Sequence, residues 1–355
     1  MRGQPERILV IIPSPVLGGA EAQTLQIARG FCTMGAEVAV AAEPAVLSAA
    51  GTALGGVRPL PAPLRAPEGG GFIAWQRDAA GALLRGWRPD AALVCCPLPT
   101  EGFGALLALS EAAIPALAVA HLVRQDWHLA EGEHLALRQI RAEWAAVSVP
   151  TARRLEALFN LPPHRVAAIP NGLPPAAARS ADRARFGLPE GVPLLVQVGR
   201  LDIRKGAQLT PAIAAAIAPA LMVLGGNGPL RADLERADGV RVLGHVADVP
   251  GLLACADALL LASEHEGCPL SVLEAARAGC PILATRQALE AWPEAGNMAR
   301  LVLRDPPHIA HVFAEALRDS AGSSRRVVRA HEVSAAWDEE AMLARTAFLL
   351  AAACA

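Results

Sequence analysis

Short apolar runs alternate with longer helical patterns along this chain, and the alternation occurs in two successive series. The strand-length runs of the first series are Ile8 to Ile12, Glu37 to Ala41, Ala91 to Val94, Ala116 to Ala120 and Trp144 to Ser148. Those of the second series are Leu194 to Val198, Leu221 to Leu224, Arg241 to Leu243, Ala258 to Leu261 and Pro281 to Ala284. Apolar strands that alternate with helices are typical of parallel sheets with helices on both faces. The sequence therefore predicts an α/β protein with two doubly wound, Rossmann-like domains.

A stretch rich in proline and alanine, Leu173 to Ser180, separates the two series and carries no strand pattern. The expected parts are an N-terminal domain at residues 1–172, a linker at 173–190, a second domain at 191–335 and a C-terminal helix at 336–355 that packs back on the first domain. The 355 residues, of which 53% are hydrophobic, suffice for two cores. The segment from Pro44 to Gly71 has no regular pattern and stays unassigned.

The composition argues against several classes of protein. A formal net charge of −2 gives no overall basic field, so we expect no nucleic-acid partner. The seven cysteines form an odd set without Cys-x-x-Cys spacing, which fits neither a disulfide framework nor a zinc site. The apolar run that ends at Pro13 is too short for a secretory signal, and the longest apolar region, Ala105 to Val123, is interrupted by Glu111 and Pro115. We therefore expect a cytoplasmic protein in which this longest region forms a helix followed by a buried strand.

The chain contains 32 basic side chains, and Lys205 is the one lysine among them. Lys205 lies in the run Gly199-Arg200-Leu201-Asp202-Ile203-Arg204-Lys205-Gly206, directly after a predicted strand. In a chain that otherwise uses arginine, a lysine indicates a place where a compact point charge is needed, and phosphate oxygens are the obvious target. The alternative is that the single lysine stands at this position by chance. Other motifs must therefore decide whether this loop binds phosphate.

A glycine pair follows the first predicted strand. Gly18, Gly19, Ala20 and Glu21 open the helical run that ends at Met34, and they predict free backbone N–H groups that an anion or a sugar hydroxyl could approach. An ordinary turn between a strand and a helix is the alternative. The run is not a dinucleotide fingerprint, because it lacks the Gly-x-Gly-x-x-Gly spacing.

Three loops that follow strands of the second series carry polar chemistry. They are Gly199 to Gly206, then Gly225-Gly226-Asn227-Gly228-Pro229, then the run from Glu264 to Glu274. In the third loop, Pro269 suits the first turn of a helix whose unsatisfied N–H groups would favour an anion. Glu266 and Glu274 are eight residues apart, a separation of at most about 12 Å along a helix. Glu274 has mostly apolar neighbours, which predicts a buried carboxylate with a partner, whereas a surface glutamate is the alternative.

Together these residues resemble the family 4 glycosyltransferases of the GT-B fold, with the E-x(7)-E element at Glu266 and Glu274. The motifs stand in the family's order and approximate spacing. They are Gly18-Gly19-Ala20-Glu21, His121, Ser148, Ile169-Pro170-Asn171-Gly172, Gly199-Arg200, Lys205-Gly206, Gly226-Asn227-Gly228-Pro229, Gly244-His245-Val246 and Glu266-Gly267-Cys268-Pro269. The resemblance covers nearly the whole chain and is strongest from Gly199 to Gly279.

The resemblance implies two Rossmann-like domains that face each other across a cleft, and transfer of a sugar from a nucleotide-diphosphate sugar with retention of configuration. It implies that Arg200 and Lys205 neutralise the diphosphate without a metal or other cofactor, that Glu274 accepts hydrogen bonds from ribose hydroxyls, and that Glu266 holds the donor sugar. The other donor-binding positions that it implies are Gly18, Gly19, Gly226, Gly228, His245, Val246, Gly267, Cys268, Pro269 and Leu270. His121, at the end of a predicted strand, would lie beside the reacting sugar, although a lone histidine there is otherwise as often structural.

The sequence departs from the family pattern after the strand that ends at Ala284. The family often shows a glycine pair there, whereas this chain reads Thr285-Arg286-Gln287-Ala288-Leu289, with Pro293-Glu294 kept further on. That loop usually lies near the diphosphate and the sugar. We therefore expect an altered donor geometry.

The acceptor and the donor base are less well specified. The resemblance favours a UDP- or GDP-sugar, and a glycan, lipid-linked or small-molecule acceptor, with bacterial polysaccharide or lipid-linked glycan synthesis preferred. Arg138, Arg141, Arg153 and Arg154 form a basic patch that could rest on the inner face of an anionic membrane, and a solvated helix face is the alternative. Two further interpretations stay open: a nucleotide-sugar epimerase of the same fold, and a non-catalytic relative that binds a nucleotide-sugar as a partner or scaffold.

Overall fold

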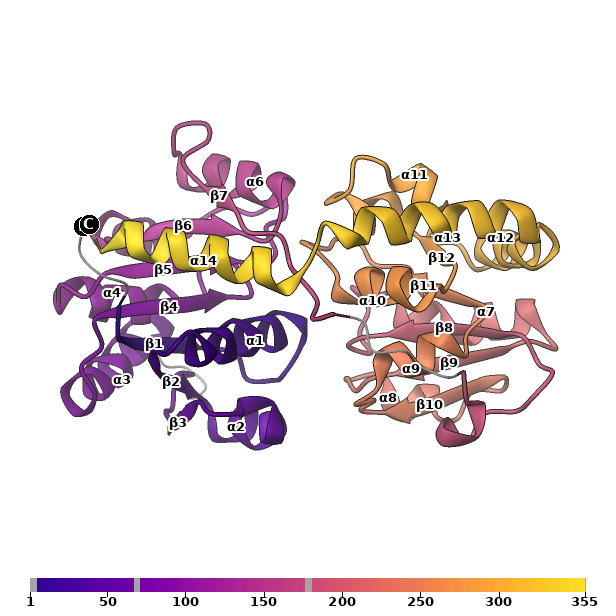
Figure 1. Ribbon diagram of the computed structural model, residues 1–355, viewed down its shortest axis with the longest axis horizontal. Helices are drawn as coiled ribbons and strands as arrows, with labels where there is room; N and C mark the ends of the chain where they lie inside the picture. Colours follow the sequence, from indigo (N-terminus) through magenta and orange to yellow (C-terminus); the bar gives the residue numbers. More distant parts are fainter. Residues whose placement is uncertain (1–4, 67–70, 176–180, 355) are drawn as a thin grey trace. The chain divides into compact units, whose positions relative to one another are not determined.

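The computed structural model describes residues 5–66, 71–175 and 181–354, which form two compact units (Figure 1). The first unit ends at Asn171 and takes up the chain again from Glu340, and the second runs from Gly172 to Glu339. Each unit contains one parallel sheet with helices packed against it. Residues 176–180 of the expected linker lie outside the described residues, and part of its remainder is a 3₁₀ helix, η2 (Arg183–Phe186).

The sheet of the first unit has the strand order β3-β2-β1-β4-β5-β6-β7. Its strands are β1 (Arg7–Ile12), β2 (Glu37–Ala42), β3 (Arg58–Pro61), β4 (Ala91–Cys96), β5 (Ala116–Ala120), β6 (Glu143–Ala146) and β7 (Ala167–Ala168). Every pairing is parallel, and β1 lies between β2 and β4. The central strands β1, β4 and β5 are buried and apolar from Ile8, Ala91 and Ala116 onward, because helices cover both of their faces.

The helices of the first unit connect successive strands and include the end of the described chain. They are α1 (Gly19–Thr33), α2 (Pro44–Ala50), η1 (Gly51–Leu54), α3 (Phe72–Gly86), α4 (Phe103–Glu111), α5 (Glu131–Gln139), α6 (Val149–Phe159) and α14 (Glu339–Ala353). Helix α14 packs on α1 so closely that a Cβ atom on Gly30 would lie 2.3 Å from Cδ2 of Leu343. The glycine is therefore what permits this helix contact.

The second unit repeats the strand order of the first, as β10-β9-β8-β11-β12-β13. Its strands are β8 (Leu194–Val198), β9 (Leu221–Gly225), β10 (Val240–Gly244), β11 (Ala258–Leu261), β12 (Ile282–Ala284) and β13 (Arg300–Leu301). Its other elements are η3 (Ala207–Leu209), α7 (Thr210–Ile217), α8 (Arg231–Leu234), α9 (Val249–Ala254), α10 (Leu270–Ala278), η4 (Arg286–Leu289), α11 (Ala295–Met298), α12 (Pro306–Arg318) and α13 (Ser320–Ala335). A buried apolar cluster that includes Leu224, Leu260 and Phe313 fills the space between sheet and helices.

The prediction of two doubly wound parallel sheets is confirmed. All ten predicted strands are present, with ends that differ by at most two residues. The strands β3, β7 and β13 escaped prediction because they are at most four residues long. The segment that had no pattern, from Pro44, holds α2, η1 and β3 in its described part. Among the described residues, no helix combines the length and the apolar character that a membrane crossing requires.

Candidate functional site

Each sheet has a point at which the strand order reverses direction. In the second unit this point lies between β8 and β11, because β9 and β10 continue on one side and β12 and β13 on the other. In doubly wound sheets, ligands bind outside the carboxyl ends of the strands at this point. The two loops that leave it are the run after β8, from Gly199 to Gly206, and the run after β11, from Ala262 to Pro269.

These two loops are joined by an ion pair. The ammonium nitrogen of Lys205 lies 2.5 Å from Oε1 of Glu266, and the hydroxyl of Ser263 donates a hydrogen bond of 2.7 Å to the same oxygen. The side chain of Lys205 is 35% exposed and that of Glu266 is 11% exposed, so the pair lies at the surface of the switch point and not in the core. The structure thus brings together two residues that the sequence selected independently.

Two side chains that the sequence did not predict as site residues form hydrogen bonds with the backbone of Lys205. The carboxylate of Asp202 accepts a hydrogen bond from the N–H of Lys205 at 3.0 Å and lies 3.4 Å from Nε of Arg200. The side-chain amide of Gln197 donates to the carbonyl of Lys205 at 3.0 Å. An aspartate side chain often accepts a hydrogen bond from a backbone N–H a few residues further along in a turn. The spacing of Asp202 and Lys205 could therefore have predicted this hydrogen bond.

The glycines of the second unit permit close contacts between loops. Gly226 has a φ angle of +148°, and a Cβ atom on it would lie 1.8 Å from the carbonyl oxygen of Gly199. A Cβ atom on Gly228 would lie 2.4 Å from the carbonyl oxygen of Leu201. Gly206 has a φ angle of +79° and abuts the backbone of Ala262. These positions therefore need glycine for the packing of the loop that carries Arg200 and Lys205.

The remaining predicted positions of the donor site lie after β10 and at the start of α10. His245 is exposed and Val246 is half-buried directly after β10, while Gly267 and Cys268 are buried. Helix α10 begins at Leu270, with Pro269 as the flanking residue that precedes it. The sequence predicted Pro269 in the first turn of this helix. It lies one position earlier, because its backbone is extended and not helical.

Glu274 lies on α10 among buried apolar neighbours and is itself partly buried. Burial raises the pKa of its carboxyl group to about 7. No described residue gives this carboxylate a hydrogen bond or an ion pair, so the partner that the sequence predicts for Glu274 stays a prediction. Val272, Leu273 and Ala275 surround its part of the helix and offer no side-chain donor. Glu274 is thus an acceptor without a protein donor.

The loop that departs from the family pattern connects to the same network. The hydroxyl of Thr285 donates to the carbonyl of Ser263 at 2.7 Å, and its oxygen accepts from the N–H of Ala288 at 3.2 Å. Ser263 in turn contacts Glu266. Arg286, the residue after Thr285, is exposed. The altered loop therefore forms an ordered 3₁₀ turn that supports the residues beside Lys205 and adds an arginine at the end of β12.

In the first unit, one expectation about the glycine pair is wrong. The N–H of Gly18 is not free, because it donates a hydrogen bond of 2.7 Å to Oε2 of Glu21. The buried carboxylate of Glu21 thereby caps the N-terminus of α1, which satisfies a donor that would otherwise be open. Gly19 is exposed and has open space where a Cβ atom would stand.

His121 directly follows β5 and is buried. Its backbone N–H donates to the carbonyl of Cys96 at 2.9 Å, while its ring nitrogen Nε2 has no hydrogen-bond partner among the described residues. Burial lowers the pKa of the imidazole to about 3, so the ring is neutral at neutral pH. A neutral imidazole with an unsatisfied nitrogen can donate or accept one hydrogen bond to a bound molecule.

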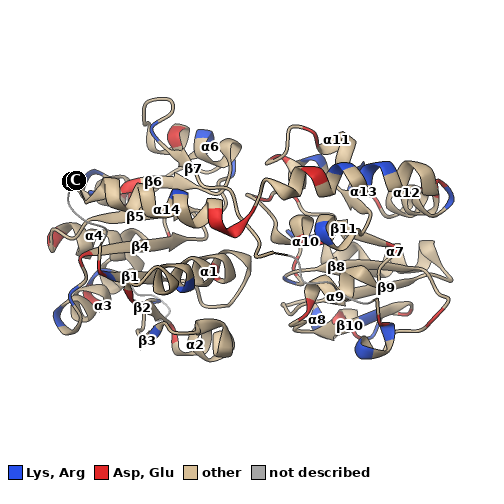
Figure 2. Cartoon of the chain, in the orientation of Figure 1, with Lys and Arg blue, Asp and Glu red and all other residues tan. Residues whose placement is uncertain are grey.

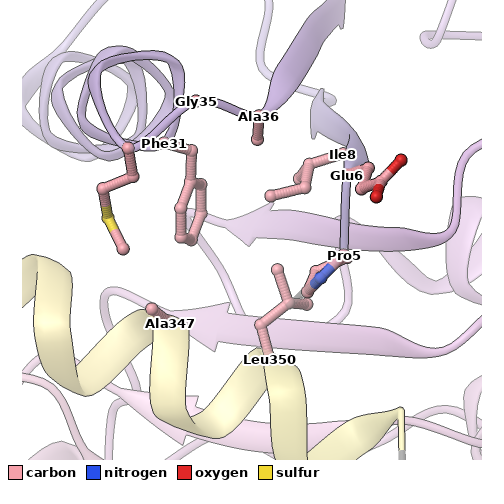
Figure 3. Close-up of a pocket in the computed structure, with 9 residues that line it drawn as sticks. Pro5, Glu6, Ile8, Phe31, Gly35, Ala36, Ala347 and Leu350 are labelled. Atoms are coloured by element: carbon pink, nitrogen blue, oxygen red, sulfur yellow. The ribbon is translucent and has the colours of Figure 1, made fainter. Parts of the chain in front are cut away.

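The first unit contains a small cavity and a larger one. The smaller, of about 130 Å³, lies between α1 and α14, where Ile8, Phe31 and Leu350 converge (Figure 3). Its lining includes Glu6, which precedes β1, and Ala36, which precedes β2. This cavity therefore lies at the amino ends of the strands, whereas His121 lies at the carboxyl end of β5. The larger, of about 500 Å³, lies beside α6 and the segment that follows β5. No group of three or more His, Cys, Asp and Glu side chains within the described part of the chain could hold a metal ion.

The described chain thus consists of two doubly wound α/β units. The second carries a lysine–carboxylate pair at its switch point, and the first carries a neutral histidine after a strand. Two family models match the chain. Residues 17–177 match the model described as Glycosyltransferase Family 4, and residues 192–319 match the model described as Glycosyl transferases group 1. The chain belongs to the family 4 glycosyltransferases and has the GT-B fold.

Curated relatives match part of the chain. A GDP-mannose-dependent alpha-(1-6)-phosphatidylinositol dimannoside mannosyltransferase of Mycobacterium tuberculosis is 32% identical over 42% of this chain and 42% of its own length. A 2-deoxystreptamine glucosyltransferase of Streptomyces kanamyceticus is 30% identical over 46% of this chain and 51% of its own length. The matched region is thus about half of the length of these relatives, or less.

Two solved structures match nearly the whole chain. HepE of Anabaena in complex with UDP-glucose has a TM-score of 0.81 with 18% identity, over 98% of this chain and 99% of that chain. WaaG, a glycosyltransferase involved in lipopolysaccharide biosynthesis, has a TM-score of 0.75 with 17% identity, over 97% of this chain and 98% of that chain. At this identity the likeness establishes the fold.

Proposed function

We propose that this protein is a retaining glycosyltransferase, which transfers a sugar from a nucleotide-diphosphate sugar to a hydroxyl group of an acceptor. The observation that carries the proposal is the pair Lys205–Glu266 at the switch point of the second sheet, 2.5 Å apart and partly exposed. A cation and a carboxylate at this point are suited to a ligand that carries both a diphosphate and sugar hydroxyls. Family membership supports the same conclusion.

The donor would bind on the second unit. Arg200 and Lys205 would neutralise the diphosphate, and Glu274 would accept hydrogen bonds from the ribose hydroxyls. Glu274 supports this role because its carboxylate is partly buried without a donor from the described residues, so a hydroxyl of the ligand would compensate its desolvation. Glu266 would hold the donor sugar, and the backbone after Gly244 would contact the base.

In the reaction, the bond between the anomeric carbon and the phosphate oxygen breaks, and its electron pair stays on the leaving diphosphate. A new bond forms between the anomeric carbon and the acceptor oxygen on the same face of the sugar. The proton of the acceptor hydroxyl passes to the leaving phosphate oxygen, so no protein nucleophile takes part. Charge that develops on the diphosphate is the main electrostatic demand, and Arg200 and Lys205 would meet it without a metal ion.

His121 would lie beside the reacting sugar, as a neutral hydrogen-bonding group. Its depressed pKa makes it a poor candidate for storing a proton at neutral pH, because the imidazolium form is disfavoured by burial. Its unsatisfied Nε2 supports a contact with a sugar hydroxyl instead. We propose this hydrogen bond as its contribution.

The donor is a UDP- or GDP-sugar in this proposal. The structural neighbour HepE was solved with UDP-glucose, and the mycobacterial relative is named as GDP-mannose-dependent. The acceptor would be a glycan, a lipid-linked glycan or a small molecule in bacterial polysaccharide or lipid-linked glycan synthesis. The protein would act in the cytoplasm, and it would contact the inner face of the membrane if its acceptor is lipid-linked.

Donor hydrolysis in the absence of an acceptor tests the proposal directly. The protein is incubated with UDP-glucose or GDP-mannose and a chelator, and release of the nucleoside diphosphate is followed together with the configuration of the released sugar. We expect slow release with one donor, with retained configuration, that Lys205→Ala abolishes. An epimerised nucleotide-sugar, or binding without any release under these conditions and with added acceptors, would contradict the proposal in favour of an epimerase or a scaffold.

A further inference from the structure

An exposed arginine stands beside the candidate donor site and has no role in the donor binding described so far. Arg286 directly follows Thr285 at the end of β12, in the loop where this chain departs from the family pattern. Its side chain is exposed, and no described residue forms a hydrogen bond or an ion pair with it. The guanidinium can therefore bind an anionic group of a ligand.

The strand order places Arg286 on the far side of Glu266 from Lys205. The three residues follow β12, β11 and β8, which are successive neighbours in the sheet. Leu261 pairs with Ala284, so the loops after β11 and β12 leave the sheet at the same level. Adjacent strands are about 4.8 Å apart, so the end of β12 is about 5 Å from β11 and about 10 Å from β8. A sugar that Glu266 holds would therefore have a different cation on each side.

A chain of hydrogen bonds fixes the backbone at Arg286 relative to Glu266. The hydroxyl of Thr285 donates to the carbonyl of Ser263 at 2.7 Å, and the hydroxyl of Ser263 donates to Oε1 of Glu266 at 2.7 Å. Thr285 is buried, and its side-chain oxygen also accepts from the N–H of Ala288 at 3.2 Å. The backbone that carries Arg286 is thus held in place, while its own side chain is exposed.

Glu266 keeps one carboxylate oxygen for a ligand. Its Oε1 accepts from Lys205 and from Ser263, whereas no described residue donates to its Oε2. The side chain is only 11% exposed, so this oxygen has limited access to water. A sugar hydroxyl that donates to Oε2 would replace the lost hydration. The sugar would then lie at the end of β11, next to the strand that carries Arg286.

Most neighbouring charges at this edge of the second sheet are paired. Arg200 lies 3.4 Å from Asp202, and the guanidinium of Arg304 pairs with Glu264. Arg204 has no carboxylate partner among the described residues, but it belongs to the loop after β8, on the side of the diphosphate. Both signs of charge occur across the second unit (Figure 2). The positive charge that remains beside β12 is therefore local.

We propose that Arg286 selects donors whose sugar carries a carboxylate, so that the preferred donor is the nucleotide-diphosphate form of a hexuronic acid. The inference rests on the proposed function, because it names the class of sugar that the same site takes. A guanidinium presents N–H groups in a fixed plane that match the two oxygens of a carboxylate. In such a donor the sugar ring separates the carboxylate from the diphosphate, as β11 separates the strands before Arg286 and Lys205.

Calorimetry with the full chain tests the proposal on three matched pairs of donors. They are UDP-glucose and UDP-glucuronic acid, UDP-galactose and UDP-galacturonic acid, and GDP-mannose and GDP-mannuronic acid. Within each pair the sugars differ only in a hydroxymethyl or a carboxylate group. We expect the acidic donor of one pair to bind at least about tenfold more tightly than its neutral partner, which is the scale of one charge-assisted pair.

Arg286→Gln should remove this preference. The acidic donor should then bind no better than its neutral partner, whose own affinity should change by less than about twofold. Binding of the neutral donor also shows that the variant is folded. Arg318→Gln is the matched control, because Arg318 is an exposed arginine at the end of α12 that pairs with no described carboxylate. It should leave both affinities unchanged.

Three results would overturn the proposal. The first is equal or weaker binding of the acidic donor in every pair by the wild type. The second is a preference that persists in Arg286→Gln. The third is an equal loss of both donors of a pair in this variant, which would assign Arg286 to the diphosphate.

Lys205→Ala separates this proposal from the proposed function. If this variant weakens binding of every donor that the wild type binds, the donor site lies at the switch point. Equal affinities within each pair would then overturn only the proposal for Arg286. A wild type that binds none of the six donors would contradict both.

Discussion

Lys205 and Glu266 are 61 residues apart in the sequence and form an ion pair of 2.5 Å at the point where the second sheet reverses its strand order. Each residue comes from the loop after one of the two strands that flank this point, β8 and β11. Doubly wound sheets place ligands there, so the pair lies where a nucleotide is expected. A bound diphosphate would form an ion pair with Lys205 in place of Glu266. The carboxylate of Glu266 would then be available to accept hydrogen bonds from the sugar.

Lys205→Ala should weaken binding of the nucleoside diphosphate at least tenfold, or by about 1.4 kcal/mol, because it removes one cation from the diphosphate site. Its cost in stability should be about 1 kcal/mol or less, since the ion pair is partly exposed. Calorimetry and urea unfolding measure the two effects. Arg236→Ala is the control, because it breaks an exposed pair with Asp233 elsewhere in the same unit. Equal affinity in Lys205→Ala and wild type would remove Lys205 from the donor site.

Glu274 should make donor binding depend on pH. Its carboxyl has a pKa of about 7 in the free protein, so it is largely protonated below that pH. Ribose hydroxyls donate to the ionised form, so binding should release close to one proton at about pH 6 and almost none at about pH 8. Calorimetry in buffers with different ionisation enthalpies measures this release. Glu274→Gln should abolish it, and a wild type that releases no proton at the lower pH would contradict the assignment.

His121 should make folding stability depend on pH in the acid range. Its folded pKa of about 3 lies below the unfolded value of 6.5, so between these values the unfolded chain binds a proton that the folded chain does not. Stability contributed by this group is therefore fully present above pH 6.5 and falls as the pH drops, by at most about 1.4 kcal/mol per pH unit. Urea unfolding from pH 7 to pH 5 measures the slope, which His121→Gln should reduce. An equal slope in both proteins would show that the imidazole is protonated when folded.

Gly226→Ala should strongly destabilise the second unit. A Cβ atom would lie 1.8 Å from the carbonyl oxygen of Gly199, at a φ angle of +148° that only glycine adopts readily. We expect a loss of about 3 kcal/mol or more in the free energy of unfolding. Gly296→Ala is the control, because that helical position has open space and should gain up to about 1 kcal/mol. Similar stabilities for the two variants would contradict the contact between the loops.

The packing of α14 on α1 can be tested with a double-mutant cycle. Gly30→Ala alone should destabilise the protein, because its methyl group would overlap the side chain of Leu343. In the Leu343→Ala background the same change should be neutral or stabilising, since the methyl group fills the gap and alanine favours the helix. Urea unfolding of the four proteins gives the coupling. Additive effects would contradict a direct contact between these residues.

The strands and the motif positions could be predicted because each depends on residues that are close in sequence. Apolar runs predicted the central strands, whereas β7 and β13 are pairs of residues that only tertiary pairing defines. The turn glycines were recognised, but the contact that Gly226 makes with Gly199 joins residues from two loops. Such contacts depend on the assembled fold and leave no local pattern.

The residues that support the candidate site escaped prediction for the same reason. Ser263 and Thr285 are 22 residues apart, and their shared hydrogen bond connects the altered loop with the residue that contacts Glu266. Conversely, the sequence predicted a free N–H at Gly18, which was wrong, and a partner for Glu274, which no described residue supplies. Glu21 caps its own helix, and α10 presents no donor to Glu274. Both results depend on the direction in which a side chain points, and the spacing of residues in the sequence does not specify that direction.

Binding of nucleotide-sugars to the purified protein tests the central claim most directly. The melting temperature is measured with UDP-, GDP-, ADP- and dTDP-sugars in the presence of a chelator, since a ligand that binds the folded state raises it. The account predicts a selective rise with one nucleotide class, which Lys205→Ala and Glu274→Ala both abolish. A melting temperature that no donor changes, or a rise that persists in both variants, would contradict a donor site at Lys205, Glu266 and Glu274.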